Sequence, residues 1–170
     1  KPVSKDWESF AETLSGQAAI AIDNALLFEE LQQSNMEITR AYDTTLEGWA
    51  KALELRDHDT EGHSRRVTDL TIQLANMLGL PNKEIPHIRR GALLHDIGKM
   101  AIPDEILRKE DSLTDKEWEI IKKHPLYAKE MLESVQYLEE ALDIPLYHHE
   151  RWDGSGYPYG SSGEEIPLPA

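Results

Sequence analysis

The feature that most constrains this chain is a long stretch without proline. No proline occurs from Trp7 to Arg56, and the only glycines there are Gly16 and Gly48. Because proline breaks helices and glycine weakens them, this stretch predicts one long helix, or two helices joined with little break. No part of the sequence shows a convincing strand alternation, so we expect the fold to be built from helices.

The long helix carries a seam of residues at alternating spacings of 4 and 3, which is the pattern of a coiled coil. The seam consists of Phe10, Leu14, Gln17, Ala21, Asn24, Phe28, Leu31, Asn35, Ile38, Tyr42, Thr45, Trp49 and Ala52. Its polar members lower stability, but they can fix register and oligomeric state. We expect a parallel homodimer through this helix; the alternative is a surface helix packed on its own domain.

The composition of the chain restricts which molecules it can bind. A formal net charge of -14 over 170 residues repels nucleic-acid backbones and anionic membrane surfaces, so we expect neither as a partner. A nucleotide substrate would then need a local positive centre, which metal ions can supply. The chain has no cysteine, which excludes disulfide and thiolate chemistry and suggests the cytoplasm. No apolar run is long enough to span a bilayer.

Adjacent His95 and Asp96 follow an apolar helical face. Ile88, Ala92 and His95 continue this face at spacings of 4 and 3, and Gly98 is expected to end the helix in a left-handed conformation. An imidazole beside a carboxylate suits iron, manganese or zinc. The alternative for this pair alone is a buried histidine that is satisfied by the neighbouring carboxylate.

Three further segments place imidazoles on or next to apolar faces. His63 begins an apolar stripe that should point into a core, His124 lies one turn after Ile120, and His148 and His149 stand side by side. Five such histidines and an aspartate exceed the four ligands of a structural zinc site. The set instead predicts two adjacent metals with open positions for water and substrate.

The remaining elements are expected from local signals. Thr114 and Glu117 form a capping-box pattern that begins a helix. We expect that helix to continue to His124, and we interpret His58 and His87 as surface histidines. By residue range, further helices are expected after 62, from about 82 to 95, around 126–132 and over 135–142, with a surface loop at 104–111 and a glycine-rich loop at 153–160.

Together these motifs resemble the HD-GYP family of the HD phosphohydrolase superfamily over about residues 40–170. The resemblance is carried by Arg56-Asp57, Gly62-His63-Ser64, Leu94-His95-Asp96-Ile97-Gly98-Lys99, His124-Pro125, His148-His149-Glu150-Arg151-Trp152-Asp153-Gly154 and Gly156-Tyr157-Pro158. It implies an all-α fold, an HD-domain helical bundle with a long N-terminal helix. It also implies hydrolysis of cyclic di-GMP to linear pGpG or GMP.

The resemblance also assigns metal ligands by motif position. They are His63, His95, Asp96, His124, His148 and His149, and Asp96 would bridge two metals. Three-metal members of the family usually have a glutamate where this chain has Asp59; Asp59 is therefore either a third-metal ligand or only an acid near a helix start. The implied cofactors are two or three divalent ions, iron or manganese first, with zinc, nickel or magnesium as alternatives.

Lys99 and the Gly156-Tyr157-Pro158 loop are the expected substrate contacts. Asp96 and Lys99 would be catalytic, with the Lys99 ammonium on the phosphate; the alternative is an exposed lysine at a helix end. Gly156, Tyr157 and Pro158 would line the guanine side of the cleft or dock a diguanylate cyclase partner. A plain surface turn is the alternative for this loop.

The predicted organisation has two parts. Residues 1–39 form a stalk, in which residues 16–31 resemble the last helix of a GAF sensory domain, and residues 40–170 form the catalytic domain. Family members continue past the position of Ala170 with another metal-binding aspartate, so we expect a longer natural protein with a sensory domain upstream. The competing functions are a catalytically degenerate binding module and a hydrolase of another nucleotide or cyclic dinucleotide.

Overall fold

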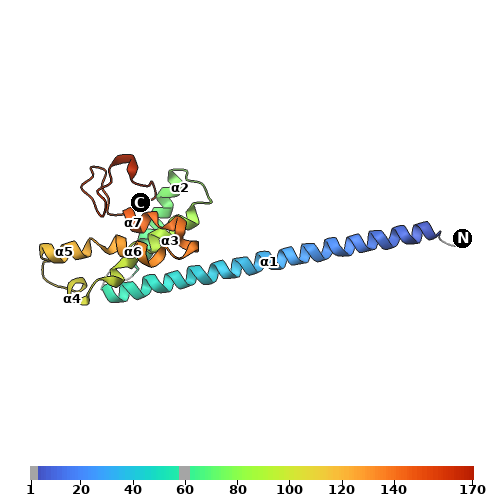
Figure 1. The fold of residues 1–170 in the computed structure, drawn as a ribbon, viewed down its shortest axis with the longest axis horizontal. Helices are drawn as coiled ribbons and strands as arrows, with labels where there is room; N and C mark the ends of the chain where they lie inside the picture. Colours follow the sequence, from blue (N-terminus) through green and yellow to red (C-terminus); the bar gives the residue numbers. More distant parts are fainter. Residues whose placement is uncertain (1–3, 58–61) are drawn as a thin grey trace. The chain divides into compact units, whose positions relative to one another are not determined.

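The computed structural model describes residues 4–57 and 62–170, and all of the regular elements in these ranges are helical (Figure 1). The elements are α1 (Lys5–Asp57), α2 (His63–Met77), α3 (Ile85–Leu93), η1 (Ile97–Ala101), α4 (Asp104–Leu107), α5 (Asp115–Ile121), α6 (His124–Leu132), η2 (Gln136–Ala141), α7 (Asp143–Tyr147) and η3 (Gly163–Glu165), where η marks a 3-10 helix. The predicted all-α class is confirmed. No helix within the described ranges is both long and apolar enough to cross a membrane.

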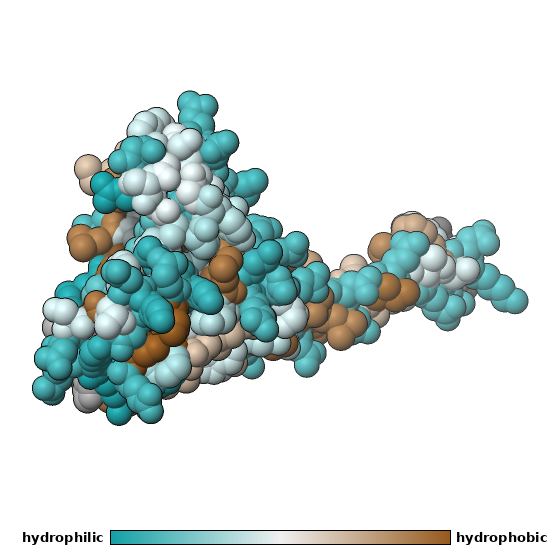
Figure 2. Space-filling view, turned by 60° about the vertical axis from the view of Figure 1, so that its left-hand side comes forward, coloured by the Kyte–Doolittle hydropathy of each residue, from teal (hydrophilic) through white to brown (hydrophobic). Residues whose placement is uncertain are grey.

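The chain divides into two compact units, the first ending at Tyr42 and the second beginning at Asp43. In the first unit, the apolar residues of the predicted seam are exposed. Phe10, Leu14, Phe28 and Leu31 each keep more than half of their surface accessible. Figure 2 shows apolar side chains exposed along this helical segment. The predicted long helix is present, and these four apolar side chains of its seam lie exposed.

In the second unit, the end of α1 packs through a different face from the seam. Leu46, Ala50 and Leu53 are buried, whereas Trp49 of the seam is 44% exposed. Leu46 joins a core cluster with residues of α6, η1 and η2 and of the turn before η1: Leu94, Ile97, Ala128, Leu132 and Leu138. A second cluster joins α2, α3 and α7 through Ala75, Ile88, Ala92 and Ile144. The alternative of a surface helix packed on its own domain therefore holds for residues 43–57, but through a face other than the seam.

Arg56 ties the end of α1 to the segment that follows the His95-Asp96 pair. Its guanidinium donates to the carbonyl oxygens of Lys99, Met100 and Ile102, the last at 2.7 Å. It also pairs with Asp104, at 2.9 Å between Nη2 and Oδ1. These backbone oxygens lie at the end of η1 and at Ile102, the residue that follows it. Arg56 therefore fixes η1 against α1 from 43 or more residues away.

Gly98 is a point of close contact rather than a left-handed helix stop. It lies inside η1, and its φ is not among the positive values in the chain. A Cβ at this position would overlap the carbonyl oxygen of His124 and lie 2.5 Å from the amide nitrogen of Ala128. The expectation of a left-handed cap was wrong, because the glycine is needed to let η1 approach the start of α6.

The apolar stripe of α2 faces outward, against expectation. Leu70, Leu74 and Leu78 are 65%, 57% and 59% exposed, while Ser64 and Thr68 are buried. Leu74 and Leu78 line one side of a cavity of about 340 Å³ that reaches His95 and His148. The small residues of α2 permit close packing against α3, and this packing turns the larger residues toward the open cavity.

Several local expectations also need correction. The helix before His95 begins at Ile85 and ends at Leu93, so His95 lies in the turn that follows. The charged stretch 104–111 contains the short helix α4, and His124 begins α6 instead of ending α5. Residues 136–141 are a 3-10 helix. The capping box at Thr114 is confirmed in both of its halves.

Candidate metal centre

The predicted ligands converge into two groups that share one carboxylate. His63, His95 and Asp96 form the first group, and Asp96, His124, His148 and His149 form the second. Within each group the candidate ligand atoms all lie within 4.8 Å of one another. The chain brings them together from α2, the turn before η1, the start of α6 and the residues after α7. Asp96 is therefore the residue that the two groups share, and its role as a bridge between two metals stays a prediction.

Three of the imidazoles are oriented by backbone carbonyls of their own segments. Nδ1 of His95 lies 2.8 Å from the carbonyl oxygen of Ala92, and Nδ1 of His124 lies 2.9 Å from that of Ile121. Nδ1 of His148 lies 3.1 Å from the carbonyl oxygen of Ile144. If each Nδ1 carries the proton, each Nε2 presents a lone pair to the centre, as metal-binding histidines do.

The facing nitrogens show that this donor set fits a cation. Nε2 of His124 lies 3.3 Å from Nε2 of His148 and 3.3 Å from Oδ1 of Asp96. With both Nδ1 protons given to carbonyls, two lone pairs and a carboxylate oxygen face one another, and this arrangement is repulsive without a positive charge among them. Imidazole and carboxylate ligands suit iron, manganese and zinc, so the residues present fit a divalent metal.

Burial keeps two of the ligands neutral. It lowers the pKa of His124 to about 4, despite the Ile121 carbonyl and the charge of Asp96. Burial, followed by the charges of His148 and His124, lowers the pKa of His149 to about 3. Both imidazoles are therefore deprotonated at neutral pH, which is the state that binds a metal.

Asp96 remains ionised although it is buried. Burial raises its pKa, but the neighbouring His148 and His95 imidazoles and the charge of Lys99 outweigh that effect and lower it strongly. The same partnership raises the pKa of His95 against the effect of its own burial. The centre therefore holds a fixed negative charge that attracts cations.

Lys99 is held by two carboxylates. Its Nζ lies 2.8 Å from Oδ2 of Asp57 and 3.0 Å from Oδ2 of Asp96. Burial lowers the pKa of Lys99, but the charges and hydrogen bonds of Asp96 and Asp57 raise it overall, so the ammonium keeps its charge. The alternative of an exposed lysine at a helix end is wrong, since only 20% of the side chain is exposed.

The Gly156-Tyr157-Pro158 loop closes onto the second ligand group. The Tyr157 ring stacks on His149 with centroids 4.5 Å apart, and its amide donates to the His149 carbonyl at 3.2 Å. A Cβ on Gly156 would lie 2.5 Å from the backbone of Glu150 and Arg151, so only glycine fits there. A cis peptide bond links Tyr157 to Pro158, which is half-buried. The loop is therefore part of the site's wall, not a plain surface turn.

The structure thus brings His63, His95, Asp96, His124, His148, His149, Lys99 and Tyr157 into one region. Asp59 and His58 lie outside the described residues. His87 is half-buried, with Nε2 at 3.2 Å from Oε2 of Glu140, and it is not part of either group. Sequence reasoning missed the role of Asp57, which it noted only as part of a motif. Its position 42 residues before Lys99 gives no local signal.

Comparison with known families decides the relationship. The model of the HD domain family matches residues 48–170, which include every described candidate ligand. The chain belongs to the HD domain family. The predicted family is thereby confirmed, and the matched segment begins within α1. The likeness of residues 16–31 to a GAF helix stays a prediction.

Relatives of this HD domain protein are named as phosphodiesterases of cyclic dinucleotides. The cyclic di-GMP phosphodiesterase response regulator RpfG of Xanthomonas campestris is 39% identical over 91% of this chain. A 3'3'-cGAMP-specific phosphodiesterase of Vibrio cholerae is 36% identical over 88%, and a cyclic di-GMP phosphodiesterase of Pseudomonas aeruginosa is 44% identical over 68%. The matched segments span 40%, 28% and 28% of these proteins.

Proposed function

We propose that this chain is the catalytic part of a metal-dependent phosphodiesterase that hydrolyses cyclic di-GMP to linear pGpG, to GMP, or to both. The observation that carries the proposal is the pair of ligand groups that share Asp96. The activities for which the relatives in Xanthomonas and Pseudomonas are named support the choice of substrate.

The proposed cofactors are two divalent ions, iron or manganese first, with zinc, nickel or magnesium as alternatives. His63, His95 and Asp96 would hold one ion, and Asp96, His124, His148 and His149 would hold the other. When bound, such ions offset the negative charge of a phosphodiester and lower the pKa of water toward neutrality. Asp59 stays a proposed ligand for a third ion.

The protein's own groups would bind and orient the substrate. Lys99 uses two of its three N–H donors on Asp57 and Asp96, so a third donor can meet a non-bridging phosphate oxygen. Tyr157 and Pro158, with Gly156, would line the guanine side. The phenol of Tyr157 stays neutral, since burial raises its pKa to about 12, and it can donate a hydrogen bond.

Purified full-length protein loaded with manganese or iron tests this proposal. Incubation with cyclic di-GMP followed by product chromatography should show pGpG, GMP or both. Absence of turnover with iron, manganese and zinc, in protein that has bound them, would contradict it.

A specific observation supports a second substrate. The Vibrio relative, which matches 88% of this chain, is named as specific for 3'3'-cGAMP. The same assay with 3'3'-cGAMP at equal concentration separates the two substrates by their kcat/KM ratio. The catalytically degenerate module is disfavoured, because every predicted ligand within the described residues reaches the centre.

The proposed assembly is a parallel homodimer through α1, which would link the HD domain to an upstream sensory domain. The exposed seam from Phe10 to Tyr42 supports it, since a lone helix would leave these apolar side chains in water. We further propose residues 1–39 as stalk and 40–170 as catalytic domain.

Two parts of the proposal concern the cellular setting. The Gly156-Tyr157-Pro158 loop would dock a diguanylate cyclase; the nearby Trp152 and Tyr159 are 74% and 52% exposed and offer an apolar contact. A cytoplasmic location is proposed because the chain has no cysteine.

A further inference from the structure

Among the described residues, the helix that begins with His63 has no side-chain cap of its own. Its N-cap residue is Gly62, which has no side chain to accept a hydrogen bond and adopts φ 74°. A helix start leaves several amide N–H groups without intrahelical partners. His63 is the first residue of α2, so any fraying of this turn moves its imidazole directly.

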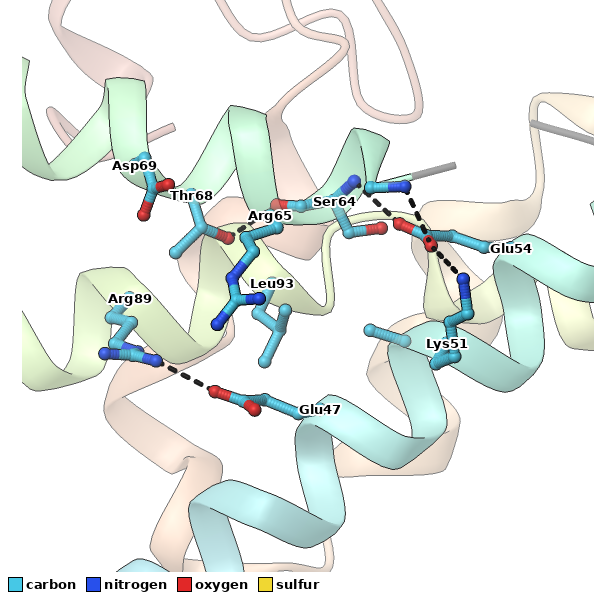
Figure 3. Close-up of a pocket in the computed structure, with 11 residues that line it drawn as sticks. Glu47, Lys51, Glu54, Ser64, Arg65, Thr68, Asp69, Arg89 and Leu93 are labelled. Atoms are coloured by element: carbon cyan, nitrogen blue, oxygen red, sulfur yellow. Dashed lines mark hydrogen bonds and ion pairs between the residues drawn. The ribbon is translucent and has the colours of Figure 1, made fainter. Parts of the chain in front are cut away.

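A carboxylate from α1 fills this role. Oε1 of Glu54 accepts from the amide of Ser64 at 3.0 Å, and Oε2 accepts from the amide of Gly62 at 3.3 Å. Figure 3 shows both bonds, with the Glu54 side chain reaching from α1 across to the start of α2. In an ordinary capping box, two side chains of the helix itself serve such amides. Here one side chain from another helix serves both.

Glu54 is buried and charged at this place. Only 9% of the residue is exposed, and Lys51 lies 3.7 Å from Oε2. Burial raises the pKa of Glu54, but the hydrogen bonds from Ser64 and Gly62 lower it overall. Its neighbour Leu53 lies buried on the core face of α1, which holds the backbone of Glu54 in place.

We infer that Glu54 is a positioning residue for the metal ligand His63: it fixes the first turn of α2 from α1 and so sets where the imidazole of His63 lies. The inference rests on the proposed metal centre. His63 belongs only to the ligand group with His95 and Asp96, while His124, His148 and His149 are held by other elements. Loss of the Glu54 carboxylate should therefore weaken one metal site and spare the other.

The chain offers a matched control for this charge. Glu47 lies two turns earlier on α1 and lines the same cavity of about 600 Å³ as Glu54. Its carboxylate pairs with Arg89 at 2.9 Å and is 47% exposed (Figure 3). Glu47→Gln removes the same charge from the same helix without touching the start of α2.

The test measures Mn²⁺ binding to the metal-free full-length protein by calorimetric titration and elemental analysis, for wild type, Glu54→Gln, Glu54→Ala and Glu47→Gln. Loss of partners that orient a metal ligand typically lowers affinity about 10- to 100-fold. We expect such a loss at one of two sites, larger for Glu54→Ala than for Glu54→Gln, which keeps one acceptor oxygen. Glu47→Gln should bind as wild type does.

A double-mutant cycle separates positioning from general stability. His63→Ala removes the ligand itself, so adding Glu54→Gln to it should change metal affinity no further. Equal weakening of both sites, an additive effect on His63→Ala, or wild-type binding by Glu54→Gln would each overturn the inference. A wild-type protein that binds no metal would instead contradict the proposed function. Where Glu54→Ala does not fold, the Glu54→Gln measurements decide.

Discussion

At the scale of single residues, the ligands of this centre are aimed by nearby main chain. His95, His124 and His148 each place Nδ1 against a carbonyl oxygen three or four residues earlier. Such a contact needs the imidazole to lie at or just beyond a helix end, where carbonyls and side chains of adjacent turns meet. The centre is therefore largely pre-organised by the ends of short helices.

The shared carboxylate gives the first prediction. Asp96→Ala should remove both metals and lower hydrolysis by at least about 100-fold. Losing a group that only orients a ligand costs up to about 100-fold, and Asp96 is a ligand itself. His95→Ala should also lower bound metal and activity. His149→Ala should remove only one metal, since His149 belongs to one group. Elemental analysis per chain checks the stoichiometry. Near-wild-type metal content and rate in Asp96→Ala would show that the ligand groups are misassigned.

Gly98 gives the second prediction. Gly98→Ala places a methyl group onto the backbone oxygen of His124, so η1 and α6 must move apart. We expect a loss of stability of about 1–3 kcal/mol and weaker metal binding, because Asp96 and His124 separate. Denaturant unfolding and metal titration measure both effects.

Gly48→Ala is the control for this substitution. Gly48 lies in α1, and an added methyl group would have no heavy atom within 4 Å beyond its own helical neighbours. Alanine should therefore stabilise the helix by about 0.5–1 kcal/mol. A Gly98→Ala protein as stable as the Gly48→Ala protein would contradict the close contact.

At the scale of elements, α1 shows why periodicity alone was insufficient. Leu46, Ala50 and Leu53 have the same 4 and 3 spacings as the seam residues Thr45, Trp49 and Ala52. Both sets fit a helix face, but only the first is buried, and its Leu46 packs in one cluster with residues of α6, η1 and η2. One face at the end of α1 thus packs into the core of the domain, and the seam stays exposed to a partner.

The third prediction concerns the start of α5. Thr114 Oγ1 accepts from the amide of Glu117 at 3.3 Å, and Glu117 Oε2 accepts from the amide of Thr114 at 2.7 Å. Thr114→Ala should lower stability by about 1 kcal/mol, the usual cost of losing a cap. Ser112→Ala, in the exposed turn before the cap, should change stability by less than about 0.5 kcal/mol. Equal unfolding midpoints for the two variants would count against the cap.

At the scale of the whole molecule, the continuous helix Lys5–Asp57 gives the fourth prediction. A helix transmits rotation rigidly, and a dimeric one has discrete packings between which it can switch. Two or three residues inserted near Ser34 shift the seam's phase, whereas seven restore it. Activity of the full-length protein should fall or lose regulation with the short insertions and recover with the heptad.

Sedimentation supplies the matching check on this idea. If the seam pairs two copies of α1, the full-length protein should be a dimer at micromolar concentration. Asn24 and Asn35 should keep the two helices in one register. A monomer, or equal behaviour of all three insertions, would reduce α1 to a tether.

The helical class, the long helix and the set of ligand types could be predicted from the amino-acid sequence. These depend on local properties: proline is absent from 7–56, the Thr114 cap lies within four residues, and imidazoles follow apolar residues at helical spacing. The resemblance then ordered the ligands around Asp96. Short-range rules are sufficient here because each rule concerns residues within a few turns of one another.

The way these parts meet became visible only in the folded chain. The Lys99–Asp57 pair joins residues 42 positions apart. Glu54, on α1, caps the start of α2, a different helix. The true reason for Gly98 is a backbone contact with His124, which no local pattern contains. Such choices depend on which surfaces are buried against each other, and burial is a property of the packed chain rather than of any one segment.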